Sequence, residues 1–317
     1  MKKFTKFLII LALLPILFLS SCKEDDAATG VDNPAFEALQ TYLVDNQMDL
    51  NQIISTTENG KFATTAKDGK YIIDIRSAED FGKGHLDGAV NSSLVNILET
   101  AKAADKEILV VCYTGQTAAR AVVALRLSGY PNAKLLKWGM SNQGNSGPWD
   151  SNIGDAAKGH ANWTNDAPVN PSTYPAPVLY TTATEGADIL KERVQAMLEN
   201  TAWSIKNTDV LATPSNYQIN NYFSEGDWNA FGHFKGAHRL NPLTLNGSQV
   251  FNLDPNQTIV TYCYTGQTSS IITAYLHVLG YDKAKSLLYG MNGLQNTHSQ
   301  WTDNTAITGN QWTQGGH

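Results

Sequence analysis

Two identical six-residue segments hold the side chains best suited to chemistry in this chain of 317 residues. The letters Cys-Tyr-Thr-Gly-Gln-Thr occupy residues 112–117 and recur at residues 263–268. Each cysteine ends a short apolar run and is followed by a stretch with helical spacing, so its thiol faces the unpaired N–H groups of a helix start. Such N–H groups favour the thiolate. The pattern predicts a cysteine nucleophile that carries negative charge.

The glycine of each segment allows the backbone to curl so that successive amides face inward. We therefore predict that Cys112 and Cys263 are nucleophiles whose thiols have lowered pKa values. The other loop residues are the predicted substrate-binding set: Tyr113, Thr114, Gly115, Gln116, Thr117, Tyr264, Thr265, Gly266, Gln267 and Thr268. The alternative is that both cysteines are small buried hydrophobic residues. Packing alone, however, does not require the same tyrosine, threonine and glutamine in both segments.

These loops belong to a longer tandem repeat. A Gly-His pair at residues 84–85 recurs 148 positions later, and a Gly-Met pair at residues 139–140 recurs 151 positions later, the same spacing as the loops. Apolar runs such as 108–111 and 259–262 alternate with stretches of helical spacing. That alternation predicts α/β domains, each with a mainly parallel sheet.

The domain boundaries follow from composition. Four prolines lie between residues 166 and 178, which predicts an extended linker. We predict a first domain over residues 34–165 and a second over residues 179–317. A signal peptide over residues 1–21 and a tether over residues 22–33 precede them.

The N-terminus reads as a secretion signal. Its apolar run, residues 7–19, contains Pro15 and falls short of the about 20 residues that span a bilayer. This favours a signal peptide over a membrane-spanning helix. Residues 19–22, Leu-Ser-Ser-Cys, resemble the lipobox of bacterial lipoproteins, which implies lipidation of Cys22 and attachment to a membrane through it.

The localisation that follows is the cell envelope, at the outer membrane, facing the periplasm or the cell surface. Residues 23–26, Lys-Glu-Asp-Asp, resemble the surface-export signals of some Bacteroidetes lipoproteins. The alternative reading of these four residues is a solvated, charged tether.

The charge of the chain limits its partners. The formal net charge is −6, and it becomes −9 once Lys2, Lys3 and Lys6 leave with the signal peptide. An acidic chain offers no surplus of cations to displace phosphate counterions, which excludes nucleic acid as a partner. His85 and His233 could join a cysteine in a metal site, but the lack of metal-ligand spacing around them favours a role in turns. Arg120 is expected at a solvated surface position.

The segment from Asp74 to Asn91, followed by the cysteine loop and its helix, resembles the rhodanese-type sulfurtransferase domain. The resemblance covers residues 35–145 and 185–295 and implies two rhodanese-like domains, each a central five-stranded parallel sheet flanked by helices. It also implies that the loop cysteine takes a sulfane sulfur from a small donor and holds it as a persulfide among the loop amides. A thiol or cyanide acceptor then removes the sulfur, with no metal and no organic cofactor.

Loop length and composition narrow this expectation. A six-residue loop matches the sulfur-transferring members, whereas the related Cdc25-like phosphatases have a seven-residue loop that ends in arginine. The loops here contain neither Arg nor Lys, which leaves the donor open between the thiosulfate and the 3-mercaptopyruvate class. We expect a monomer. The alternative function is a non-catalytic envelope lipoprotein that uses rhodanese folds to bind a persulfide or a partner.

The second copy lacks the Asp74–Arg76 pair that precedes the loop of the first. Depending on where the gap falls, its equivalents are Asn220 and Tyr222, or Tyr222 and Ser224. Cys112 is therefore the safer prediction for the nucleophile.

Overall fold

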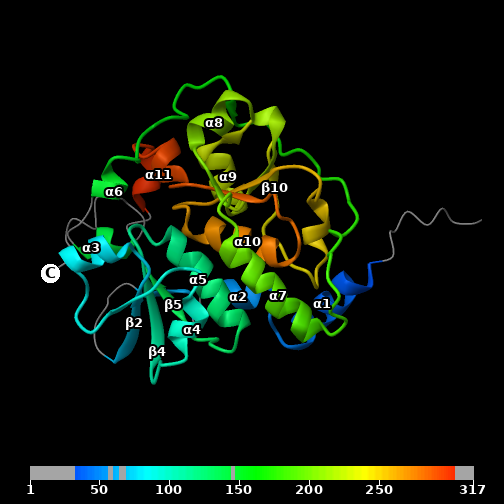
Figure 1. Ribbon diagram of the computed structural model, residues 1–317. Helices are drawn as coiled ribbons and strands as arrows, with labels where there is room; N and C mark the ends of the chain where they lie inside the picture. The colour runs from blue at the N-terminus through cyan, green and yellow to red at the C-terminus, as the bar shows by residue number, and fades with distance from the viewer. Residues whose placement is uncertain (1–32, 56–59, 64–68, 144–146, 304–317) are drawn as a thin grey trace, which may run out of the picture.

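The computed structural model describes residues 33–55, 60–63, 69–143 and 147–303. Within them, the chain forms two parallel five-stranded sheets with helices packed around them (Figure 1). The predicted α/β class, with two domains that are each built on a central parallel sheet flanked by helices, is confirmed.

The sheet of the first domain has the strand order β1-β5-β4-β2-β3. Its strands are β1 (Phe62–Ala63), β2 (Lys70–Asp74), β3 (Val90–Asn91), β4 (Glu107–Val111) and β5 (Lys134–Leu136). Its helices are α1 (Pro34–Asp45), α2 (Leu50–Ile54), α3 (Ala78–Lys83), α4 (Ile97–Ala101), α5 (Gln116–Leu127) and α6 (Gly147–Asp150), with a 3₁₀ helix η1 (Gly139–Gln143).

The second domain repeats this order as β7-β12-β11-β8-β10. Its strands are β7 (Ser204–Ile205), β8 (Gln218–Asn221), β10 (His238–Arg239), β11 (Ile259–Tyr262) and β12 (Lys285–Leu287). Its helices are α7 (Gly186–Glu199), α8 (Asn207–Ala212), α9 (Glu225–Phe231), α10 (Gln267–Val278) and α11 (Met291–Leu294), and its 3₁₀ helices are η2 (Pro214–Asn216), η3 (Gln249–Asn252) and η4 (Ser299–Asp303). A separate antiparallel pair joins β6 (Trp163–Thr164) to β9 (His233–Phe234).

Burial on both faces explains the central strands. β4 and β11 are nearly continuous apolar runs because each sheet is covered by helices on both sides. The helices that follow, α5 and α10, lie side by side at the centre of the molecule (Figure 1). Both are buried almost all round, and on α5 alanines at 118, 119, 121 and 124 permit the close approach. The helices that follow the two cysteine loops therefore form the middle of the domain interface.

The N-terminal helices extend this interface. α1 packs against α7, and a Cβ atom at Gly186 would lie 2.4 Å from the carbonyl oxygen of Ala38, so glycine is needed there. Asp49, at the start of α2, accepts hydrogen bonds from the backbone N–H groups of Leu245 (3.0 Å) and Asn246 (3.1 Å). Segments before the first sheet thus brace the second domain.

The expectation of a solvated Arg120 is wrong. This residue is only 2% exposed, and its guanidinium donates hydrogen bonds to the carbonyl oxygens of Met197 (2.5 Å) and Asn200 (2.7 Å). It also lies over the ring of Trp203. Arg120 therefore ties α5 to the end of α7, a role that depends on domain docking and is invisible in local sequence.

Residues 154–164, assigned by sequence to the first domain, pack on the second. The N–H of Ala157 donates to the carbonyl oxygen of Leu294 (2.8 Å), and β6 pairs with β9. Residues 165–181, all of them described, hold no helix or strand. Tyr174 in this stretch donates its N–H to the carbonyl oxygen of Phe251 (2.7 Å), so the predicted linker lies along the second domain.

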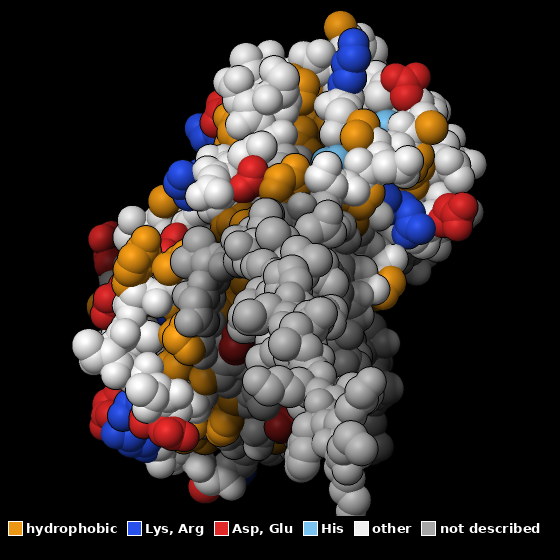
Figure 2. Space-filling model, turned by 90° about the vertical axis from the view of Figure 1, so that its right-hand side faces the viewer, with side chains coloured by type: hydrophobic (Ala, Val, Ile, Leu, Met, Phe, Trp, Pro, Cys, Tyr) orange, Lys and Arg blue, Asp and Glu red, His pale blue; other side chains and the backbone are white. Residues whose placement is uncertain are grey.

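Acidic and basic side chains lie interspersed on the face that Figure 2 shows. In the described part of the chain no helix has the length and apolar character to cross a bilayer. The predicted signal peptide and Cys22 fall outside the described residues.

Candidate active site: the two cysteine loops

Each cysteine loop lies where a buried central strand ends and a buried helix begins. Cys112 follows β4 and Cys263 follows β11, at the carboxyl edge of a parallel sheet. Gly115 and Gly266 precede α5 and α10, and both have φ 80° and ψ −15°, the left-handed region that glycine adopts without strain. The predicted strand–loop–helix arrangement of both cysteines is confirmed in each domain.

The Cys112 sulfur lies inside a ring of backbone amides. Its Sγ accepts hydrogen bonds from the N–H groups of Gly115 (3.1 Å) and Ala118 (3.3 Å), and the thiol is 2% exposed. Burial raises the pKa of the Cys112 thiol, although the loop amides act in the opposite direction. The predicted lowering of this pKa is therefore wrong, because removal of water from the sulfur outweighs the amide hydrogen bonds.

The Cys263 sulfur has a more polar environment. Its Sγ accepts a hydrogen bond from the N–H of Ser269 (3.2 Å) and also lies 3.5 Å from the hydroxyl of the same residue. That hydroxyl is 2.9 Å from the Ser286 hydroxyl, which in turn is 3.1 Å from the Ser270 hydroxyl. The first domain has Ala118, Ala119 and Leu135 at these three positions. Only the second sulfur contacts a side-chain hydroxyl.

A pH profile tests the environment of Cys112. Since iodoacetamide reacts with the thiolate, a raised pKa places the midpoint of the alkylation rate above the ordinary thiol value of about 8.5. We expect slow alkylation of Cys112 at pH 7 and a rate that is still rising above pH 8.5. Peptide-level mass spectrometry measures it. A midpoint below 8.5 would show that the amides outweigh burial.

Each loop tyrosine is held by a residue of the helix that follows the neighbouring strand, α3 in the first domain and α9 in the second. The hydroxyl of Tyr113 donates to the carboxylate of Asp80, and the hydroxyl of Tyr264 donates to that of Asp227. Both carboxylates also belong to a cap in which a serine begins the helix. The Tyr113 hydrogen bond is the main cause that lowers the pKa of Asp80 to about 2. Sequence reasoning missed these two aspartates, although Ser-x-x-Asp recurs in both copies.

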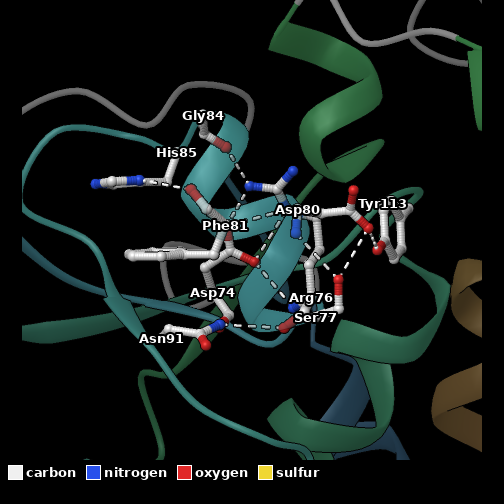
Figure 3. Close-up of polar contacts among 9 residues, drawn as sticks. All are labelled: Asp74, Arg76, Ser77, Asp80, Phe81, Gly84, His85, Asn91 and Tyr113. Carbon is white, nitrogen blue, oxygen red and sulfur yellow. Dashed lines mark hydrogen bonds and ion pairs between the residues drawn. The ribbon is translucent and has the colours of Figure 1, made fainter.

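The Asp74–Arg76 pair is present as an ion pair buried behind the first loop (Figure 3). Arg76 donates to both carboxylate oxygens of Asp74, from Nη2 to Oδ2 at 2.7 Å and from Nε to Oδ1 at 3.1 Å, and Nη2 also donates to the carbonyl oxygen of Gly84 (2.7 Å). The guanidinium lies 5.8 Å from the ring centre of Tyr113. Arg76 thus connects the strand end, the Gly-His turn and the loop tyrosine.

The residues of the second domain that are equivalent to Asp74 and Arg76 are Asn221 and Phe223. Both pairs predicted from the sequence were therefore wrong. Asp74 pairs with Val111, next to Cys112, and Asn221 pairs in the same way with Tyr262, next to Cys263. The Asn221 side chain keeps the backbone contact, accepting from the N–H of Phe223 (2.8 Å). Phe223 replaces the arginine and stacks on the Tyr264 ring with centroids 4.7 Å apart. An aromatic stack therefore takes the place of the ion pair.

Placing the side chains of the second domain at positions 74 and 76 of the first domain tests this replacement. We expect Arg76→Phe alone to lower the free energy of unfolding by about 3 kcal/mol, because it leaves the Asp74 carboxylate buried without its partner. The double change Asp74→Asn with Arg76→Phe should recover most of that loss. Urea unfolding of the two variants and the Asp74→Asn control completes the cycle. A double variant no more stable than Arg76→Phe would rule out this explanation.

Two glycines support the loops from behind. Gly139 has φ 56°, and a Cβ atom there would lie 2.1 Å from the carbonyl oxygen of Cys112. Gly290 has φ 51° and the same 2.1 Å relation to Cys263. The Gly-Met repeat marked both positions, but only the structure shows that each glycine touches the cysteine backbone.

The loop threonines and glutamines are directed into the protein. Thr114 and Thr265 are buried and accept hydrogen bonds from Gln116 (3.0 Å) and Gln267 (3.3 Å), respectively. Thr117 and Thr268 lie half-buried in the first turns of α5 and α10. The carboxamide oxygens of both glutamines accept hydrogen bonds from the opposite domain.

The two landmark histidines lie in different surroundings. His85 is exposed and stacks on Phe81 at 3.8 Å, whereas His233 is buried, stacks on Trp228 at 3.6 Å and contacts the carbonyl oxygen of Asp166 (2.8 Å). Among the described residues, no three His, Cys, Asp or Glu side chains gather in a way that could hold a metal ion.

The family model for the rhodanese-like domain matches twice, over residues 58–144 and 209–297. Together these matches cover more than half of the chain, and each contains one cysteine loop. The chain belongs to the rhodanese-like domain family. Its two rhodanese-like domains share one strand order and one loop sequence.

Relatives and solved structures with sulfurtransferase names are similar to parts of the chain. Thiosulfate sulfurtransferase GlpE of Shewanella oneidensis is 32% identical over 96 residues, covering 30% of this chain and 87% of that protein. GlpE of Pseudomonas fluorescens is 32% identical over 73 residues, 22% of this chain and 67% of that protein. SseA from Escherichia coli, a structure described with the 3-mercaptopyruvate sulfotransferases, is 15% identical with a TM-score of 0.27 and covers 78% of this chain and 95% of that one. At the family level these rhodanese-like domains are of the sulfurtransferase type.

Proposed function

We propose that this protein moves a sulfane sulfur from a small donor to a thiophilic acceptor through persulfides on Cys112 and Cys263. The observation that carries the proposal is the Cys112 sulfur within hydrogen-bonding distance of two inward-facing amides. Such amides can hold the negative terminal sulfur of a persulfide without any charged side chain. Sulfur is favoured over phosphate because neither loop contains the arginine that would bind a phosphate.

The reaction is balanced with thiosulfate as the probe donor. The Cys112 sulfur attacks the outer sulfur of thiosulfate, an S–S bond to the protein forms, and the bond from that sulfur to the sulfite group breaks. The thiol proton leaves with the sulfite as hydrogen sulfite, and the protein keeps an anionic persulfide. Cyanide then takes the outer sulfur as thiocyanate and leaves a thiolate, which takes up a proton from water to restore the thiol. The raised pKa of the Cys112 thiol fits this order, because the proton is lost only as the donor reacts.

Turnover assays separate catalysis from mere binding. The protein is mixed with cyanide and either thiosulfate or 3-mercaptopyruvate, and thiocyanate is measured over time. We expect repeated turnover with at least one of the two donors, and loss of turnover after complete alkylation of the cysteines. Persulfide formation that stops at one sulfur per cysteine would instead support the binding-module function and overturn the enzymatic one.

The setting of this activity is proposed to be the cell envelope, with the protein a monomer attached through a lipid on Cys22. The lipobox-like Leu-Ser-Ser-Cys supports the anchor. The burial of α5 against α10 within one chain supports the proposed monomer.

Cys22→Ser tests the anchor. Without an acylated cysteine the acyl chains that hold a domain at the bilayer are absent, so the protein should move from the membrane fraction to the soluble fraction. Immunoblots of both fractions measure the change, with Cys263→Ser as a control that leaves the lipobox intact. Retention of Cys22→Ser in the membrane fraction would contradict the lipid anchor.

A further inference from the structure

The two cysteine loops are connected by a reciprocal pair of hydrogen bonds across the domain interface. The side-chain oxygen of Gln116, in the first loop, accepts from the backbone N–H of Tyr289 in the second domain (2.8 Å). The side-chain oxygen of Gln267, in the second loop, accepts from the backbone N–H of Trp138 in the first domain (3.2 Å). Both glutamines are buried, so these carboxamides have no solvent to replace the contact.

The residues that receive these contacts belong to the support of the opposite cysteine. Trp138 and Tyr289 occupy equivalent positions and both have positive φ, 70° and 64°. Each immediately precedes the glycine that touches the cysteine backbone, Gly139 or Gly290. Gln116 therefore holds the turn behind Cys263, and Gln267 holds the turn behind Cys112.

The loops also touch directly. A Cβ atom at Gly115 would lie 2.3 Å from the side-chain oxygen of Gln267, and one at Gly266 would lie 2.2 Å from that of Gln116. Both loop glycines thus have a second constraint besides their left-handed φ. A displacement of one loop has to move the glutamine of the other, since packed interiors transmit strain.

We propose that Gln116 and Gln267 are positioning residues that act on the opposite domain, so that each sets the reactivity of the other domain's cysteine. The two loops are then one coupled unit rather than two independent sites. This deepens the proposed function and rests on it for its catalytic meaning. Thiol alkylation can test it even if the protein transfers no sulfur.

The alternative roles for these glutamines lie within their own loop. Gln116 donates to Thr114 (3.0 Å), so it could serve only to stiffen the loop around Cys112. Thr114→Val is a matched control, because it removes that contact and leaves the hydrogen bond from Tyr289 in place. Gln116→Met removes both while keeping the length of the side chain.

The experiment measures iodoacetamide reaction at both cysteines of the full chain by peptide-level mass spectrometry. Reaction of a buried thiol needs local opening, and loss of one buried hydrogen bond raises the open population about fivefold. We expect Gln116→Met to raise the alkylation rate of Cys263 about fivefold and that of Cys112 by less. Gln267→Met should have the reverse effect, raising the alkylation rate of Cys112 about fivefold and that of Cys263 by less. Thr114→Val should leave the Cys263 rate within about twofold of wild type.

Equal acceleration of both cysteines, or acceleration only within the mutated domain, would overturn the proposal. A wild-type measurement covers the case in which a variant fails to fold. Under partial alkylation, coupled loops give more doubly labelled molecules than independent labelling predicts, because a label in one loop displaces the glutamine of the other. A distribution that matches independent labelling would overturn the coupling.

Discussion

Serine in place of both Cys112 and Cys263 is expected to reduce sulfurtransferase turnover at least about 10³-fold, the scale on which loss of a catalytic nucleophile acts. Serine keeps the size of the side chain but cannot form a persulfide. The loop amides remain in place, so the change removes the sulfur atom and little else. The rate of thiocyanate formation with one fixed donor measures the loss.

The unfolding midpoint of the double variant serves as the control for this experiment. Both side chains are buried and free of disulfides, so an almost isosteric hydroxyl should leave the unfolding midpoint near that of the wild type. A folded double variant that retains substantial turnover would show that the sulfur is carried elsewhere, and the proposed persulfide route would be wrong.

Cys112→Ser is expected to remove most of the turnover, and Cys263→Ser a smaller part. The two loops have the same sequence, but the residues that pack behind them differ. In the first domain, Arg76 links the strand, the Gly-His turn and the Tyr113 ring through charged contacts. Phe223 has aromatic contacts in their place, with the rings of Tyr264, Phe231 and Tyr262. Catalysis depends on the placement of the reacting groups, so the more firmly held loop should carry the larger share.

The hydroxyl of Ser269 argues in the other direction. It lies 3.5 Å from the Cys263 sulfur, and the first domain has an alanine there. If Cys263→Ser proves the more damaging change, this hydroxyl rather than the ion pair decides competence. Ser269→Ala in the second domain and Ala118→Ser in the first form a matched pair that would then shift turnover between the domains. Rates for both single cysteine variants, measured with the same donor and cyanide, give the answer.

The sequence was sufficient for the fold because the signals are local and duplicated. Apolar runs before each cysteine and helical spacing after it predicted β4 with α5 and β11 with α10, and the structure confirms both pairs. The register of the second copy was wrong because the extra residues are divided among several places. One of them lies within α9, between the serine cap and Gly232, so Asn221 and Phe223 could be identified only from strand pairing.

Properties that depend on docking and burial could not be predicted. The sequence around Arg120 is typical of an exposed helix residue because its partners, Met197 and Asn200, lie 77 and 80 positions away along the chain. The cross-domain bonds of Gln116 and Gln267 require a placement of two domains that no local pattern encodes. The pKa of Cys112 depends on the balance between loop amides and exclusion of water, and only the packed structure shows how deeply the thiol is buried.

Mass spectrometry after exposure to a sulfur donor tests the persulfide most directly. The protein is incubated with thiosulfate, 3-mercaptopyruvate or polysulfide, and its intact mass and cysteine peptides are measured before and after cyanide is added. The proposed function predicts a gain of about 32 Da on Cys112, a persulfide that cyanide removes. A protein that stays unchanged in mass with every donor, or whose added sulfur resists cyanide, would contradict sulfur transfer through this cysteine.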